Sequence, residues 1–187
     1  HVVERLLTPP EQLEELTPEA VGSRGPTVQL DVPASEPEQA VSRYEAFAGQ
    51  HEGVIARSLF CAGLSFPGVV FAEDRAALNI LCRLPEVDPE RIGCGGLSGG
   101  GLRTAYLAGL DDRVRCAVSV GFMSTWRDFA LQKSFTHTWI LYTPQLPSYL
   151  DFPELLGLRV PLPSLVLATT EDPLFSLEEV KKAGKIV

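Results

Sequence analysis

The chain has 187 residues, enough for one domain with a hydrophobic core and too few for two large ones. Hydrophobic residues make up 45% and charged residues 21%, which excludes a mostly disordered chain, a collagen-like repeat and a coiled coil. The net charge of −8 argues against a nucleic-acid partner, which needs a basic face. The sequence has no run of about 18 apolar residues, so no membrane span is expected.

Residues 1–34 contain five prolines and are expected to form an irregular arm. The rest, residues 35–187, is expected to form one domain. Ser35 and Glu38 have the spacing of a helix capping box, and apolar residues recur at helical intervals as far as about residue 60. Residues 63–68 should break this helix, and residues 70–84 should form a second one.

Short strands then alternate with helices. Residues 91–97 form a short apolar run made up mostly of small residues, which is typical of a strand covered on both faces. Further strands are predicted at 114–120 and 165–170, and a helix at 102–110. This alternation predicts an α/β fold with a mostly parallel sheet flanked by helices. Residues 126–139 are expected to be helical, within a proline-rich, cap-like insertion at about 122–163.

The four cysteines show no paired spacing, and three have apolar neighbours, so we expect reduced thiols in the core and a cytoplasmic location. Cysteine and histidine spacings fit no zinc pattern, and the acidic residues form no calcium loop. We therefore expect no metal and no cofactor.

The most informative motif is GLSGG at residues 96–100, a G-x-S-x-G sequence between a predicted strand and a predicted helix. This spacing favours a sharp turn that projects the hydroxyl of Ser98 above the sheet, while the amide of Gly99 lies at a helix N-terminus, where a developing oxyanion would be stabilised. The alternative is a glycine-rich packing turn. A phosphate-binding loop has no support, because neither phosphate-loop pattern is complete.

A serine nucleophile needs a base, and the base needs an acid to orient it. Asp172 follows the last predicted strand and is the candidate acid; Glu171 is the nearest competitor, and a helix-capping or turn role is the alternative. Of the three histidines, His1 and His51 are expected to be solvated. His137 precedes the acid, so packing or substrate contact is favoured over a role as base.

VDPERIG at 87–93 running into GLSGG, with DPLF at 172–175 two strands later, resembles the α/β-hydrolase superfamily, in its acetylxylan-esterase and dienelactone-hydrolase-like branch. The resemblance covers about residues 45–187. It implies a serine carboxylic-ester hydrolase with Ser98 as nucleophile, Asp172 as acid and Gly99 as one oxyanion donor. Dienelactone hydrolases proper have cysteine in place of Ser98.

The family's histidine follows the acid, but no histidine follows Asp172 here, and the N-terminal strands with the second oxyanion donor are also not found. We therefore expect a partial domain that lacks these strands and the C-terminal strand with the histidine. A non-catalytic scaffold or inactive fragment is the first alternative, and a peptidase or thioesterase of the same fold the second. The expected partner is a small-molecule ester. An incomplete sheet would also favour self-association as a homo-oligomer.

Overall fold

The computed structural model describes residues 37–187, without the side chains of 37–40, 43–46 and 50. The predicted arm at 1–34 and the capping residue Ser35 lie outside these residues. The chain divides into two compact units between Val54 and Ile55. This boundary falls inside helix α2 (Pro37–Cys61), which the sequence predicts over 35–60. The sheet and all later elements belong to the second unit.

Three parallel strands form the sheet, in the order β1 (Ile92–Leu97), β2 (Val114–Val120) and β3 (Ser164–Leu167). Their last residues are in register: Leu97 pairs with Val120, and Val120 with Leu167. Helix α4 (Gly99–Leu110) connects β1 to β2. The predicted mostly parallel sheet is confirmed, although β3 ends three residues earlier than expected.

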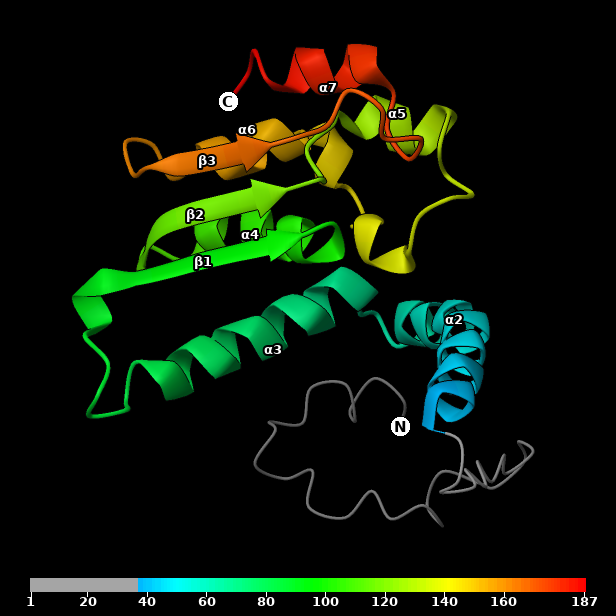
Figure 1. Ribbon diagram of the computed structural model, residues 1–187, viewed down its shortest axis with the longest axis horizontal. Coiled ribbons are helices and arrows are strands. Elements are labelled where there is room, and N and C mark those ends of the chain that lie inside the picture. The colour runs from blue at the N-terminus through cyan, green and yellow to red at the C-terminus, as the bar shows by residue number, and fades with distance from the viewer. Residues whose placement is uncertain (1–36) are drawn as a thin grey trace. The chain divides into compact units, whose positions relative to one another are not determined.

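Helices α4 and α6 (Phe152–Gly157) cover one face of the sheet and lie behind it in Figure 1. Leu102 and Ala105 of α4 are buried there, together with Ala117 and Ser119 of β2. Alternate residues of a strand point to opposite faces, so one face carries the core. A Cβ on Gly109 would collide with the carbonyl of Leu155, which shows how closely α4 and α6 approach.

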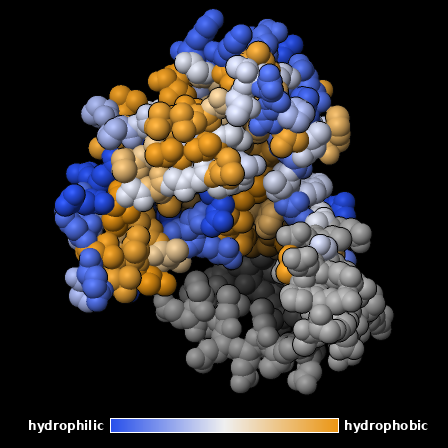
Figure 2. Space-filling model, viewed as in Figure 1, coloured by the Kyte–Doolittle hydropathy of each residue, from blue (hydrophilic) through white to orange (hydrophobic). Residues whose placement is uncertain are grey.

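The other face of the sheet is open among residues 37–187. Leu97 is 71% exposed, and Leu165 and Leu167 are about half exposed. Apolar residues gather on this face in Figure 2, over the strands that face the viewer in Figure 1. The expectation that 91–97 is covered on both faces is therefore wrong for the described part of the chain, since periodicity reports that a face is apolar and not what lies over it.

Helix α3 (Phe66–Leu81) begins four residues earlier than predicted. Gly63, with a φ of 76°, ends the turn after α2, and the Ser65 hydroxyl then accepts a hydrogen bond from the Gly68 amide at 3.2 Å. Pro67 fits the first helical turn, where an amide hydrogen has no partner to lose. The break before α3 is thus shorter than the predicted 63–68, because residues 66–68 already belong to the helix.

The segment at 122–163 contains less helix than predicted. Helix α5 (Trp126–Leu131) covers only the first part of the expected 126–139 helix, and single 3-10 turns follow at Trp139–Leu141 and Leu146–Ser148. Asp151 and Glu154 form a capping box that starts α6. Whether the segment covers a substrate, as a cap would, stays a prediction.

The buried guanidinium of Arg159 fixes the start of β3. It donates to the carbonyl of Val114 and the hydroxyl of Ser164, each at 2.8 Å, and to the carbonyls of Leu162 and Pro163. A buried cation needs such partners, because burial without them costs several kcal/mol. The end of the 122–163 segment is therefore attached to β2 and β3 by one side chain.

All four cysteines are free thiols, but none is fully buried: Cys61 and Cys116 are exposed, and Cys82 and Cys94 are half-buried. Cys82 and Cys94 pack against the core, but the prediction of core thiols is wrong for Cys61 and Cys116, which are exposed. Burial does raise the pKa of the Cys94 thiol, which keeps it protonated.

No single helix within residues 37–187 is long and apolar enough to cross a membrane. Phe47–Cys61 and Phe66–Leu81, bent by 92°, reach that length and composition only as a pair.

Within the second unit, α3 packs on α4, where Arg103 forms an ion pair with Asp74.

Candidate active site

Ser98 lies on the turn between β1 and α4, in a backbone conformation that few residues other than glycine adopt. Its φ is 55° and its ψ is −117°. Such backbone costs on the order of 1–3 kcal/mol and occurs mainly at functional sites. The side chain is exposed and makes no capping bond to α4. The turn thus holds a solvent-accessible hydroxyl at the carboxyl end of the sheet.

Backbone hydrogen bonds hold this turn. The amide of Ser98 donates to the carbonyl of Val120 at 2.8 Å, and the amide of Leu102 donates to the carbonyl of Ser98 at 3.1 Å. A Cβ on Gly96 would collide with the backbone of Gly100, lying 2.7 Å from its Cα. The first glycine of the motif is therefore needed for the chain to fold back so closely.

Gly99 is the first residue of α4, so its amide is one of the four that have no partner within the helix. The helix dipole adds positive charge at this end. Two residues further on, the carbonyl of Gly101 accepts a hydrogen bond from the Ser119 hydroxyl at 3.2 Å, which joins the start of α4 to β2. This arrangement can stabilise an oxyanion formed at Ser98.

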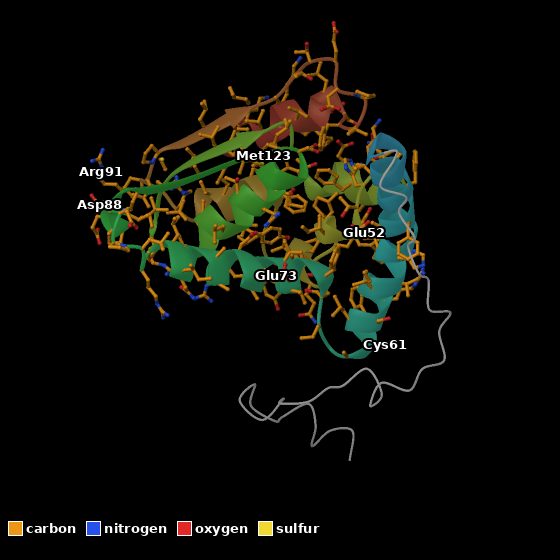
Figure 3. All side chains as sticks on the ribbon, turned by 60° about the horizontal axis from the view of Figure 1, so that its bottom comes forward. Glu52, Cys61, Glu73, Asp88, Arg91 and Met123 are labelled. Atoms are coloured by element: carbon orange, nitrogen blue, oxygen red, sulfur yellow. The ribbon has the colours of Figure 1, made fainter. Side chains whose placement is uncertain are left out.

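Asp172 lies in the loop after β3, which we call the acid loop (residues 170–176). Its carboxylate accepts a hydrogen bond from the amide of Leu174 at 2.9 Å. Asp172 is half-buried and lines a cavity of about 10 Å³ with Met123 and Phe175, whereas its neighbour Glu171 is exposed. Met123 follows the carboxyl end of β2, and Figure 3 shows it far from Asp88 and Arg91, which both precede β1.

Ser98 and Asp172 therefore follow the carboxyl ends of β1 and β3, with β2 between them. Two strand spacings separate the backbones of β1 and β3 by about 10 Å. This separation leaves room for a third side chain between a hydroxyl and a carboxylate. The structure brings the predicted nucleophile and acid to one edge of the sheet; their roles stay predictions.

Neither described histidine bonds to Ser98 or Asp172. His51 bonds to the carbonyl of Phe47 within α2 at 2.7 Å. The Nε2 of His137 lies 3.0 Å from the carbonyl oxygen of Leu174, and its ring packs beside Phe129 and Phe175. His137 is thus a packing residue of the acid loop, the role that the sequence favours over that of a base.

The sequence did not indicate the side chains that hold the acid loop. Asp128 is fully buried and accepts hydrogen bonds from the hydroxyl of Ser124 and the amide of Ser176. The second of these contacts spans 48 residues, so no local spacing could reveal it. The only available signal was an aspartate next to the apolar Phe129, on a helix of six residues.

Two larger cavities lie among the described residues. One, of about 210 Å³, lies beside β1, with the Arg103–Asp74 ion pair in its lining. The other, of about 420 Å³, lies between α5 and the turn before α6, lined by Trp126, Leu131 and Leu150. Within residues 37–187, no three histidine, cysteine, aspartate or glutamate side chains come together as metal ligands.

Comparisons with known proteins agree with this architecture. The sequence profile of the prolyl oligopeptidase family matches residues 68–155. YtaP of Bacillus subtilis (strain 168), provisionally named a hydrolase, is 31% identical over 140 residues, which are 73% of this chain and 46% of YtaP. The chain thus spans about half the length of this curated relative.

Two solved structures share the fold. A protein from Bacteroides fragilis, provisionally named an acetyl xylan esterase, superimposes with a TM-score of 0.57 at 22% identity, over 71% of this chain and 36% of that one. The glucuronoyl esterase from Solibacter usitatus gives 0.52 at 16% identity, over 62% and 33%. The parallel sheet and the turn at residues 96–100, which we call the serine turn, are therefore those of an α/β-hydrolase fold. In sequence and in fold, the chain is similar to proteins of the α/β-hydrolase superfamily.

Proposed function

We propose that this chain carries the nucleophile, one oxyanion donor and the acid of a serine hydrolase that cleaves carboxylic esters. The backbone of Ser98 supports this proposal most strongly. A packing turn at this position would be served best by glycine, which adopts a φ of 55° without strain. A serine held there in solvent, at a cost in stability, indicates that its hydroxyl is used.

In this mechanism the oxygen of Ser98 attacks the ester carbonyl carbon and gives its proton to a histidine. The amide of Gly99 donates to the resulting oxyanion. The intermediate collapses to an acyl-serine, and the departing alcohol takes the proton. Water then attacks the acyl-serine in the same way, releasing the acid and restoring Ser98. We assign the base to a histidine oriented by Asp172; the family resemblance implies a histidine that follows the acid in chain order.

The test is hydrolysis of p-nitrophenyl acetate, together with labelling by a fluorophosphonate, in the complete protein. Ser98→Ala should lower kcat/KM by several orders of magnitude and abolish the covalent adduct. Ser42→Ala, which removes an exposed serine hydroxyl from helix α2, is the control and should match the parent protein. Full activity in Ser98→Ala would exclude Ser98 as the nucleophile.

The same assay distinguishes the two candidate acids. Asp172→Asn should lower kcat roughly 10³- to 10⁴-fold, because the amide cannot hold the imidazole in the productive tautomer. Glu171→Gln alters the exposed neighbour and should have little effect. If the two variants exchanged these outcomes, Glu171 would be the acid.

A peptidase is the second candidate, favoured by the match of residues 68–155 to the prolyl oligopeptidase family. An amide and an ester would react at the same Ser98, so the serine turn does not separate them. The comparison is the kcat/KM for aminoacyl p-nitroanilides against that for p-nitrophenyl esters of the same acyl group. A higher value for the anilides would assign a peptidase.

A further inference from the structure

The acid loop is hydrogen-bonded to four side chains of one short segment, residues 128–137, which we call the clamp. The amide of Ser176 donates to the Asp128 carboxylate at 2.8 Å, and the Ser176 hydroxyl donates to the side-chain oxygen of Gln132 at 3.1 Å. In the other direction, Lys133 donates to the Pro173 carbonyl at 2.8 Å, and the His137 ring donates to the Leu174 carbonyl at 3.0 Å. Three of the four reach backbone atoms. They therefore fix the path of the loop and not only its side chains.

Asp128 is the buried member of the clamp. It is 0% exposed, and one carboxylate oxygen accepts from both Ser124 and Ser176. Its other oxygen has no partner among the described residues. Burying a carboxylate with half of its acceptor capacity unused costs free energy that an apolar side chain would not. Its contribution therefore lies in the geometry it imposes, since Ser124 follows β2 and Ser176 ends the acid loop.

Asp172 depends on that loop geometry. Its carboxylate is bonded to the Leu174 amide of the same loop, and the clamp reaches the carbonyl of Leu174 through His137. Phe175 anchors the loop from its apolar side, against Phe122 and Phe129. The loop backbone thus determines where the Asp172 carboxylate points, and the clamp determines the loop backbone.

We propose that Asp128 is a positioning residue that, through the acid loop, orients Asp172 for catalysis. This inference rests on the proposed function, in which Asp172 orients the histidine. A misplacement on the order of 1 Å in such a group can cost about 100-fold in rate. The clamp lies in the 122–163 segment, so that segment contributes to the chemistry as well as to packing.

The test uses two variants of Asp128 in the complete protein. Asp128→Leu removes the acceptor but fills the buried space, and should lower kcat about 10- to 100-fold with KM unchanged, because chemistry and not binding is affected. Asp128→Asn keeps one acceptor oxygen and should retain kcat within about threefold. A purely structural role predicts that kcat follows thermal stability, so a slow but stable Asp128→Leu variant supports positioning, whereas unchanged kcat overturns it.

The Asp172→Asn background decides whether Asp128 acts through Asp172. Positioning predicts that Asp128→Leu slows Asp172→Asn no further, because residues that act through one group are not additive. An additive loss would overturn the proposal. If Asp172→Asn alone kept the parental rate, the proposed function would fail instead. Amide hydrogen exchange at 172–176 would still test the clamp, because the clamp predicts faster exchange in Asp128→Leu than in the parent protein.

A surface variant covers the case in which Asp128→Leu does not fold. Lys133→Met removes the bond to Pro173 from a partly exposed position and should give a smaller change of the same kind: lower kcat, unchanged KM and faster exchange at 172–176. Lys181→Met, on the exposed side of helix α7 (Leu177–Ala183), is the matched control and should change none of them. Identical behaviour of the two lysine variants would overturn the proposal.

Discussion

The serine turn and the acid loop place their functional residues by opposite means. Ser98 is held by backbone contacts between residues close in sequence or on paired strands, and no described side chain of residues 37–187 bonds to it. The acid loop is held by side chains from a segment that lies 37–48 residues earlier in the chain. The turn therefore depends mainly on residues 96–102 and the neighbouring strand, whereas the loop depends on contacts with a distant segment of the chain.

This difference makes the serine turn sensitive to backbone substitutions. Gly96→Ala should destabilise the fold by about 3 kcal/mol or more, because the new Cβ would overlap the backbone of Gly100 and neither main chain can move away. Chemical denaturation measures the effect. The matched control is Gly100→Ala, whose Cβ meets nothing within 4 Å and which should be neutral or stabilising in α4. Equal stability of the two variants would show that the turn has another conformation available.

The same difference explains what the sequence could predict. The motif at 96–100 carries its own signal, and Ser98 lies between a strand and a helix as expected. The positions of β1 and β2 follow from short apolar runs, and parallel pairing then brings Asp172 to the edge where Ser98 lies. These features depend on local pattern and chain order, which the sequence contains.

Contacts between distant segments could not be predicted in this way. The bond from Asp128 to Ser176 and the guanidinium of Arg159 against Val114 leave no periodic trace, because each depends on where two separate loops meet. The open face of the sheet was missed for a related reason. Leu97 and Leu165 follow the apolar pattern that is typical of buried strand residues, but whether they are buried depends on the elements that lie over that face of the sheet.

Helix α7, which follows the acid loop, should also respond to acid, through a buried carboxylate. Glu179 in α7 is 5% exposed and accepts a hydrogen bond from Thr125 at 2.6 Å. Its bond with Lys182, and then that with Thr125, lowers the pKa of Glu179 below the ordinary value of 4.5. A carboxylate with a lowered pKa stabilises the fold above its unfolded-state pKa, and that contribution is lost as pH falls below about 4.5 through the folded-state pKa.

We therefore expect α7 to lose amide protection as the pH falls below about 4.5. Glu179→Gln should remove this pH dependence and cost about 1 kcal/mol at neutral pH, through the lost charged hydrogen bond to Lys182. Glu178→Gln is the matched control, since Glu178 bonds the same Lys182 at 3.0 Å but its side chain is 81% exposed. Protection factors from hydrogen exchange measure both. Constant amide protection of α7 through this pH range in the parent protein would contradict the expectation.

The smallest expected effect tests whether the serine turn stores strain. Ser98→Gly should raise the free energy of unfolding by about 0.5–1 kcal/mol, because glycine adopts this backbone freely, whereas Ser98→Ala keeps the strain and should be neutral. Gln145 has the other positive φ among the described non-glycine residues, but its φ of 64° and ψ of −11° lie close to the left-handed helical region. Gln145→Gly should therefore gain less than Ser98→Gly. Thermal or chemical denaturation compares them, and an equal gain would mean that the serine turn holds no strain beyond that of an ordinary left-handed residue.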